Sequence, residues 1–279
     1  MENGTRTDRA AELQGQLEAE IAALVSGEDW RRFLETVSRF HKYSANNLFL
    51  IMAQKPDATR VAGFNTWKRL GRYVRKGERG IRILAPCLYR YEDEQGEEHR
   101  RLGGFRVVSV FDISQTSGAE LPADIRPVLL EGEAPAGLWD ALAAQVVGTG
   151  FELVRGDCGG ANGCTHYGSR TVTVRDDVDD AQACKTLAHE LGHVLLGHES
   201  QLLGGCRGLL EVEAESVAYI VAQASGLDCS GYSLPYVARW AGGDLALVRK
   251  TAERVVSCAS AILAAIEVRA SSEAEEVAA

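Results

Sequence analysis

The sequence lacks any long uninterrupted apolar segment and any surplus of positive charge. No run approaches the roughly 18 apolar residues of a membrane-spanning helix, and the first residues, MENGTRTDRAAELQ, lack the apolar core of a signal peptide. These absences predict a cytoplasmic protein without membrane association. The 30 Lys and Arg residues stand against 39 Asp and Glu residues, a net charge of −9. This balance argues against a protein that coats nucleic acid or anionic lipid over its whole surface.

Cysteine is too irregularly placed to form a framework. The seven cysteines are odd in number and show no repeated spacing, which excludes a disulfide scaffold and a CxxC zinc knuckle. Cys158 and Cys164, followed by His166, make the one close cluster. A small thiol packed in a glycine-rich turn is favoured there over a metal site.

Proline is also scarce, and half of the six prolines fall in one segment, GAELPADIRPVLLEGEAPAG. Such a segment predicts a linker between two domains. We therefore expect an N-terminal domain over 1–117, a linker over 118–136, a C-terminal domain over 137–270 and an acidic disordered tail over 271–279.

The remaining chain has alternating helical and strand-like patterns, so the predicted fold class is α+β. Apolar spacing predicts helices between about residues 8 and 52, and a hairpin is predicted from GIRILAPCLYRY and FRVVSVFDI. The C-terminal domain is expected to be mainly helical. Its predicted helices are 137–147, 181–196, 209–225 and 245–266, and its predicted strands are 151–154 and 171–175.

The strongest chemical signal is His189-Glu190-Leu191-Gly192-His193, inside the predicted helix 181–196. Histidines four residues apart lie on one helix face, so both imidazoles can bind one zinc ion. Glu190 then faces the water that completes the coordination and is the candidate general base. The alternative is a pair of surface histidines on a solvated helix.

A catalytic zinc ion needs a third protein ligand. The extended pattern HExxHxxGxxH requires Gly at 196 and His at 199, where this chain has Leu196 and Glu199. His198 is therefore not expected to be the ligand, because it misses the required position by one residue.

The segment LEVEAESVAY, residues 210–219, places carboxylates on an otherwise apolar helix, where unpaired charges would be costly. Glu211 and Glu215 are four apart and share a face. One can bind the zinc ion while the other accepts the outer N–H of a ligand histidine. We expect Glu211 to be the ligand and Glu215 its outer partner, with Glu213 as the substitute ligand. An acidic, solvated helix face is the alternative.

The predicted chemistry is zinc-dependent hydrolysis of a peptide. Zinc lowers the pKa of a bound water to about 7 and polarises the scissile carbonyl, while Glu190 moves the proton to the leaving amine. The strand Thr171 to Val174, just ahead of the site helix, is predicted to accept an extended peptide at its edge.

The acidic total hides a basic segment between Arg60 and Arg82. It holds eight cations and one acid, Glu78, a local charge of +7, so the rest of the chain carries −16. Phe64, Trp67 and Tyr73 interleave with the cations. Aromatic rings that stack on bases, with Lys and Arg at the phosphates, are typical of single-strand binding. A solvated cationic loop with its aromatics in the core is the alternative, and Trp67 is the most readily buried of the three.

Both halves of the sequence resemble known families. Tyr43-Ser44-Ala45-Asn46-Asn47, the segment Ala53 to Phe64, Trp67 and the segment Gly71 to Gly80 resemble the N-terminal domain of ArdC-type antirestriction proteins. The second half, with HELGH and the 211–218 helix, resembles ImmA/IrrE-type zincin metallopeptidases. Together the resemblances span about residues 30–265.

The resemblance implies a two-domain protein that binds single-stranded DNA and carries one zinc ion. It implies protection of incoming DNA on mobile elements and supports Glu211 as the third ligand. The DNA contacts that it implies are Arg60, Trp67, Lys68, Arg72, Arg75 and Lys76.

Two other functions remain open from the sequence. The chain could be a regulatory protease that cuts a repressor-like partner, with its N-terminal domain as a scaffold. It could also be a binding protein whose zinc ion is structural.

Overall fold

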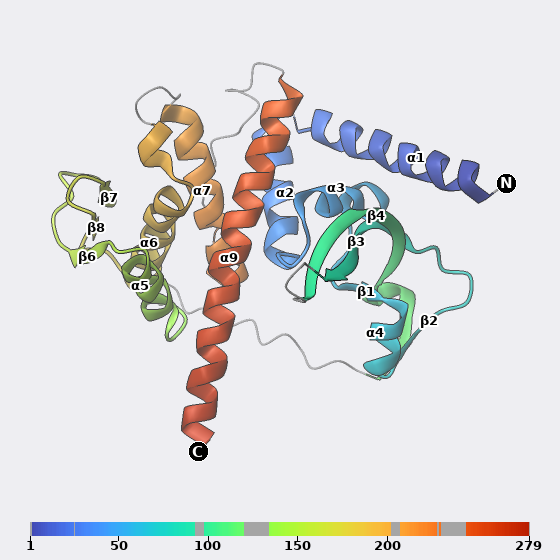
Figure 1. Ribbon diagram of the computed structural model, residues 1–279. Helices are drawn as coiled ribbons and strands as arrows, with labels where there is room; N and C mark the ends of the chain where they lie inside the picture. The colour runs from blue at the N-terminus through green and yellow to red at the C-terminus, as the bar shows by residue number, and fades with distance from the viewer. Residues whose placement is uncertain are drawn as a thin grey trace. The chain divides into compact units, whose positions relative to one another are not determined.

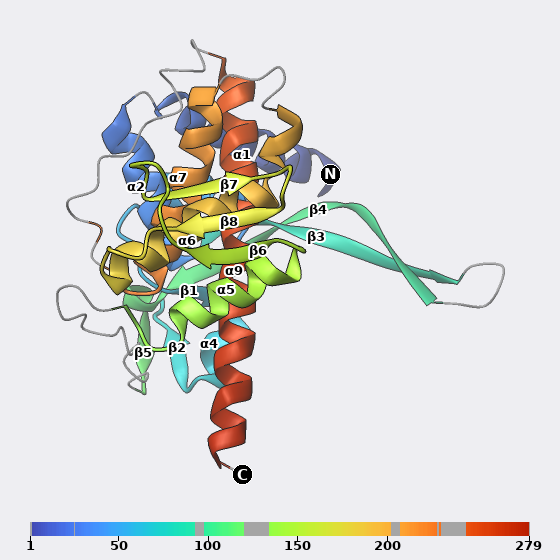
Figure 2. The ribbon, with the colours of Figure 1, turned by 90° about the vertical axis from the view of Figure 1, so that its left-hand side faces the viewer.

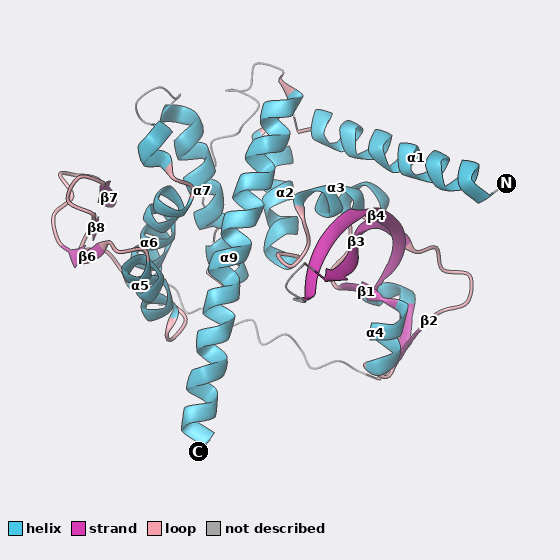
Figure 3. Cartoon of the chain, in the orientation of Figure 1, coloured by secondary structure: helices cyan, strands magenta, loops and turns pink. Residues whose placement is uncertain are grey.

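The computed structural model describes residues 2–24, 26–92, 98–119, 134–201, 207–227, 229 and 244–278. Helices and strands are mixed along the chain, and the α+β class is confirmed (Figure 3). Internal contacts divide the chain into two units. The first unit comprises Met1–Ala23 and Asn46–Ala123, and the second comprises Leu24–Ala45 and Asp124–Ala279.

Two helices supply the apolar core of the first unit. Helix α1 (Glu2–Ala22) buries Leu13, Leu17 and Ile21, which recur at helical spacing on one face. Helix α3 (Ala45–Gln54) has a run of five buried residues, Leu48 to Met52. A helix that is apolar around most of its surface is covered on most sides, so α3 is buried inside this unit.

The sheet of the first unit is antiparallel, in the order β1 (Val61–Gly63), β4 (Glu98–Asp112), β3 (Ile81–Glu92). The predicted hairpin is confirmed, and Figure 2 shows β3 and β4 extending together as a long ribbon. The register shifts between Pro86 and Leu88. Proline lacks a backbone N–H, which explains an irregularity in the ladder at this point.

Two side-chain amides cover the outer edge of β3. Asn47 donates to the carbonyl of Leu84 and accepts from its N–H, both at 2.9 Å. Gln54 makes the same pair of bonds with the backbone of Arg82, both at 2.8 Å. Each amide supplies one donor and one acceptor, as a neighbouring strand would, so α3 is fixed in register on the sheet.

The basic segment lies on short elements of the first unit. Helix α4 (Phe64–Arg69) leads into β2 (Arg72–Val74), which pairs with β5 (Thr116–Gly118). At Gly118 an added Cβ would lie 2.3 Å from the carbonyl oxygen of Gly71, and the φ angle is +132°. Only glycine fits there, so the close approach of β2 and β5 depends on it.

Helix α2 (Gly27–Arg39) lies in the second unit by its contacts, whereas the predicted N-terminal domain of 1–117 includes it. Its apolar face buries Trp30, Phe33 and Val37. The indole N–H of Trp30 donates to the Ser216 hydroxyl at 2.9 Å, inside the second unit. The predicted linker 118–136 lies mostly outside the described residues.

The second unit is mainly helical, as predicted. Helices α5 (Leu138–Gly148), α6 (Asp180–Leu195), α7 (Arg207–Ala224) and α9 (Leu245–Ala278) pack on one another (Figure 1). A small sheet has the order β6 (Glu152–Arg155), β8 (Thr171–Val174), β7 (Gly163–His166), and Figure 2 shows β8 between its neighbours. Strand β7 was not predicted from the sequence.

Helix α9 extends through Ala278, so the predicted disordered tail from residue 271 is wrong. The segment 245–278 contains neither glycine nor proline and is rich in alanine and glutamate, which favour helix. By length and a mean hydropathy of 1.4, α9 is the one described helix that could span a membrane. Its apolar residues Val248, Ala252, Val255 and Ile262 are buried in the core of the second unit.

Candidate functional site

Helix α6 carries both histidines of the HExxH motif on one face. The helix begins at Asp180, and the carboxylate of Asp179 caps it by accepting from the N–H of Gln182 at 2.7 Å. The buried side of α6 packs on α7, and an added Cβ at Gly192 would lie 3.5 Å from the Cα atom of Ala214. This close packing brings the carboxylates of α7 next to the histidines of α6.

Three donor atoms converge between the two helices. The Nε2 atoms of His189 and His193 are 3.0 Å apart. The Oε2 atom of Glu211 lies 3.4 Å from the first and 3.6 Å from the second. Among the described residues, these three side chains form the one cluster that could hold a metal ion. The structure therefore brings together the three residues predicted as ligands.

The spacing of these atoms fits a divalent cation. Ligand atoms about 2.1 Å from a tetrahedral zinc ion lie roughly 3.4 Å from one another. The observed separations of 3.0, 3.4 and 3.6 Å scatter around that value. Two imidazole nitrogens and one carboxylate oxygen are also a donor set that leaves the fourth position of zinc open.

Glu215 holds the outer nitrogen of His189, at 2.8 Å from Nδ1. This is the place predicted for it. Burial favours the neutral imidazole, but hydrogen bonds with Glu211 and Glu215 outweigh it and raise the pKa of His189 to about 10. Hydrogen bonds from the two histidines hold the pKa of Glu211 well below its usual range. The carboxylate of Glu211 is therefore ionised, as a ligand of a cation would be.

Glu213 faces away from the three donor atoms, so its prediction as substitute ligand is wrong. Its side chain is 4% exposed and accepts from Arg254 and from the Nε2 of His198. It lies about 200° around the helix from Glu211, which explains why the two carboxylates face different surroundings. Burial opposes its charge, but hydrogen bonds from His198 and Arg254 hold the pKa of Glu213 below its usual value.

Glu190 lies beside the donor atoms in a cavity of about 590 Å³. The hydroxyl of Thr165 on β7 donates to Oε2 of Glu190 at 2.7 Å. At Gly163 an added Cβ would lie 2.8 Å from Oε1 of Glu190 and 2.6 Å from the methyl group of Thr186. Strand β7 therefore positions Glu190. The sequence pattern did not reveal this, because a four-residue strand after a glycine-rich turn has no readable period.

The predicted peptide-binding edge at Thr171–Val174 is wrong. That segment is β8, whose two edges are paired with β6 and β7. Among the described strands, β7 is an edge strand of the sheet that contains β8. Its residues Gly163, Cys164 and Thr165 line the cavity.

The described cysteines are free thiols. The sulfur of Cys164 is 3.5 Å from Nε2 of His166, and Cys158 donates to the carbonyls of Gly156 and Thr173. Burial raises the pKa of Cys158 to about 11. A protonated thiol bonded to backbone carbonyls is a packing residue, in agreement with the prediction from the sequence.

The basic segment of the first unit differs from its prediction at Trp67. The Trp67 side chain is fully buried, and its indole N–H donates to the carbonyl of Phe111 at 2.8 Å. A ring enclosed in the core cannot stack on a base, so Trp67 is not a DNA contact. Among the described side chains, the exposed aromatics are Phe64, Tyr73 and Phe105, of which Phe105 was missed because it lies outside the basic segment.

Arg72 and Arg75 make internal bonds. Arg72 donates to the hydroxyl and carbonyl of Thr116 and to the carbonyl of Ala119. Arg75 donates to Glu78 at 2.7 Å and to the carbonyl of Ser114 at 2.6 Å.

Lys68 and Lys76 are exposed, and their side-chain ammonium groups make no hydrogen bond or ion pair with another described residue. The two lysines therefore present the most accessible charges among the six predicted DNA contacts.

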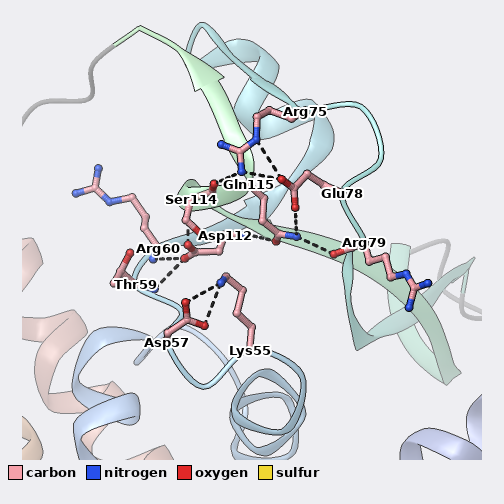
Figure 4. A network of polar contacts seen from close by, with 10 residues as sticks. All are labelled: Lys55, Asp57, Thr59, Arg60, Arg75, Glu78, Arg79, Asp112, Ser114 and Gln115. Carbon is pink, nitrogen blue, oxygen red and sulfur yellow. Dashed lines mark hydrogen bonds and ion pairs between the residues drawn. The ribbon is translucent and has the colours of Figure 1, made fainter.

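A buried polar network anchors the loops that carry these cations (Figure 4). The carboxylate of Asp112 accepts from the backbone N–H groups of Thr59, Arg60 and Ser114 at 2.8–2.9 Å. Gln115 donates to the carbonyl of Arg79 at 2.8 Å and accepts from the N–H of Asp112. Asp112 and Gln115 thus tie the segment around Arg60 to the loop that ends at Arg79, and Figure 4 shows the Arg79 guanidinium pointing away from the network.

Replacing Asp112 by alanine is expected to destabilise the first unit. Three backbone N–H groups lose their acceptor, which costs about 2–4 kcal/mol of the free energy of unfolding. The exposed Asp57, which pairs with Lys55 at 2.9 Å, provides the control. Asp57→Ala is expected to leave the free energy of unfolding nearly unchanged, as for a surface ion pair. Urea unfolding of both variants measures the difference, and equal losses would contradict the role of Asp112.

The stabilisation by Asp112 should depend on pH. Burial raises its pKa, but hydrogen bonds from Ser114, Arg60 and Thr59 outweigh burial and lower it below the usual value. A carboxyl whose pKa is lower in the folded than in the unfolded chain stabilises the fold at pH values above its unfolded pKa of about 3.9. That stabilisation is lost as the pH falls through the folded pKa. The stability gap between the wild type and Asp112→Asn is therefore expected to close in acid.

Comparison with known proteins finds a family match in the first part of the chain. Residues 7–111 match the family described as the N-terminal domain of anti-restriction factor ArdC. An uncharacterized protein of Bacillus anthracis is 24% identical over 288 residues, covering 87% of this chain. The chain spans about half of that protein, 48% of its length.

Two solved structures are also similar. One is the metal-free crystal structure of the antirestriction protein ArdC from plasmid R388, 24% identical with a TM-score of 0.50, covering 81% of this chain and 85% of that one. The other is its Mn(II)-bound structure, 23% identical with a TM-score of 0.48, covering 80% and 85%. The first of these likenesses shows the fold. Residues 7–111 thus match the model of the ArdC N-terminal domain, and the chain is similar in fold to the solved ArdC protein.

Proposed function

We propose that the chain is an antirestriction protein whose first unit binds single-stranded DNA and whose second unit is a zinc-dependent peptidase. The observation that carries the peptidase is the cavity of the second unit. It holds the three candidate ligands, His189, His193 and Glu211, together with the carboxylate of Glu190. The description of the matched family supports the antirestriction role.

The residues of the cavity divide into ligands and a base. His189, His193 and Glu211 would hold the ion, and a bound zinc ion supplies a water of lowered pKa and polarises a carbonyl. Thr165 already donates to Oε2 of Glu190, which leaves Oε1 to accept a proton. Glu190 then returns that proton to the leaving amine nitrogen.

Strand β7 is suited to align an extended peptide with this base. It is a sheet edge, and its residues Gly163, Cys164 and Thr165 line the cavity that contains Glu190. A peptide that pairs with an exposed strand edge is held by backbone hydrogen bonds, which need no particular sequence. The proposed substrate is therefore a polypeptide segment that can be presented in extended form.

Exposed aromatics and lysines support single-strand binding by the first unit. Phe64 and Tyr73 are more than half exposed, and they lie on α4 and β2, which pack on each other. Lys68 follows Phe64 on α4, and Lys76 follows β2. Rings that accept stacked bases, next to cations that contact phosphates, bind single strands with little sequence preference.

Neutralising two lysines tests the DNA half of the proposal. The double variant Lys68→Ala/Lys76→Ala is expected to bind a single-stranded oligonucleotide roughly 10- to 30-fold more weakly at 0.1 M salt. Each lost phosphate contact also lowers the log–log salt slope by about 0.7, so the slope should fall by about 1.4. Fluorescence anisotropy over a salt series measures both quantities.

The matched control replaces two exposed lysines of the second unit, Lys42→Ala/Lys250→Ala. It keeps the same net charge as the test variant, so its affinity and salt slope should equal those of the wild type. If the wild type does not bind the oligonucleotide at low salt, or if both double variants lose affinity equally, single-strand binding by this surface is refuted.

The second candidate is a regulatory peptidase that cuts a repressor-like protein, with the first unit as a scaffold. The internal hydrogen bonds of Arg72 and Arg75 favour this candidate, because guanidinium groups that stabilise the fold are less free to contact phosphates. Cleavage of such a protein without any oligonucleotide affinity would select this candidate. A structural zinc ion is disfavoured, because the candidate ligands line a cavity rather than a closed core.

A further inference from the structure

The two candidate ligand histidines are supported in different ways. His189 contacts a carboxylate directly, through Glu215. His193 contacts a second histidine, with its Nδ1 atom 2.7 Å from the Nδ1 atom of His198. His198 lies on the 3-10 helix η2 (His198–Gln201), and its side chain is 1% exposed. Its burial next to His193 is not explained by metal ligation.

The hydrogen-bond partners of His198 determine which ring nitrogens of His198 and His193 carry protons. The Nε2 atom of His198 is 3.0 Å from the carboxylate of Glu213, which can only accept, so that nitrogen carries the proton. In a neutral His198, Nδ1 is then an acceptor. The proton between the two rings therefore belongs to Nδ1 of His193, and the lone pair of His193 lies on Nε2, the atom that converges with His189 and Glu211.

Arg254 keeps the carboxylate of Glu213 ionised. Its guanidinium donates to both oxygens of Glu213, at 2.9 and 3.1 Å. A carboxylate as buried as Glu213 would be costly without such a partner. Arg254 also donates to the carbonyl of Leu196 at 2.9 Å, the C-cap of α6. The arginine on α9 therefore fixes Glu213 relative to the helix end that carries His193.

We propose that His198, Glu213 and Arg254 form a positioning relay that holds His193 as the Nδ1–H tautomer, with Nε2 ready to bind a cation. The inference rests on the proposed metal site and adds three residues to it. None of the three is among the converging donor residues His189, His193 and Glu211. Outer partners of ligand histidines fix the ring orientation and typically contribute 10- to 100-fold in metal affinity.

The test is the zinc affinity of the full chain, measured by competition with a chromophoric chelator. His198→Leu removes both ring nitrogens and is expected to bind zinc about 10- to 100-fold more weakly. His198→Asn retains an acceptor near the place of Nδ1, so it is expected to recover most of that loss. Glu213→Gln removes the charge that Arg254 holds and is expected to weaken zinc binding in the same direction.

Ser216→Ala is the matched structural control. It deletes a buried hydrogen bond of α7, the one from Trp30, and does not touch the relay. Its zinc affinity should equal that of the wild type even where its stability falls. Cobalt absorption supplies a second readout: the band of the Co(II)-loaded chain should change in His198→Leu and not in Ser216→Ala.

The outcomes separate the relay from the metal site. A wild-type chain that binds neither zinc nor cobalt refutes the site itself, and the relay with it. The relay is refuted, and the metal site is not, if the wild-type chain binds zinc and His198→Leu and Glu213→Gln bind it as tightly as Ser216→Ala does. If His198→Leu does not fold, the Asn and Gln variants decide by the same comparison.

Discussion

Glu190→Gln is expected to lower the hydrolysis of any peptide that the wild-type chain cleaves by about 10²- to 10⁴-fold. A glutamine has the same shape and can still accept from Thr165, but it cannot take a proton from water. The three donor atoms at His189, His193 and Glu211 do not include Glu190. Affinity for zinc should therefore change little, and the loss should appear in turnover.

The control for this variant is Glu199→Gln. Glu199 is an exposed acid on η2, so its replacement removes the same charge without touching the cavity lining. Digestion of a peptide library by each variant, read by mass spectrometry, compares the variants over many peptide sequences at once. Full activity in Glu190→Gln would remove Glu190 as the base, and equal loss in Glu199→Gln would point to a general charge effect.

His193→Ala is expected to weaken zinc binding by about 10²- to 10³-fold. Four-ligand zinc sites bind with about 10–16 kcal/mol, roughly 3–4 kcal/mol for each ligand, which corresponds to that range. The variant also leaves His198 without its partner on the α6 side. Isothermal titration with zinc, with the metal content of the purified chain as a second measure, gives the affinity.

His166→Ala is the matched control for the ligand. His166 is an exposed histidine at the end of β7, and it is absent from the lining of the cavity. Its loss should leave zinc affinity unchanged. If His193→Ala binds zinc as tightly as the wild type, the converging atoms of the second unit are not a metal site.

Local spacing was enough to predict the core of the candidate site. The separation of His189 and His193 sets them on one helix face, and the same spacing applies to Glu211 and Glu215. Both pairs lie where this rule predicts. The hairpin and the helices of the second unit also followed from periods of two and 3.6 residues, which depend only on the segment itself.

Long-range contacts were beyond the sequence pattern. The apolar face of α2 indicated that this helix is buried, but it did not indicate its packing partner. In the structure α2 packs on α7 of the second unit. Helix geometry turns Glu213 away from Glu211, but its partner Arg254 lies 41 residues along the chain. Trp67 is buried rather than exposed because the carbonyl of Phe111, 44 residues away, accepts its N–H. Nothing local to any of these residues identifies its partner.

The most direct test of the central claim, a cation site between α6 and α7, is anomalous diffraction from crystals grown with zinc. The account predicts one strong peak at the zinc edge, bounded by Nε2 of His189, Nε2 of His193 and an oxygen of Glu211, with Glu190 beside it and Glu215 behind His189. A map without a peak there, or with the strong peak at Cys164 and His166 instead, would contradict the account.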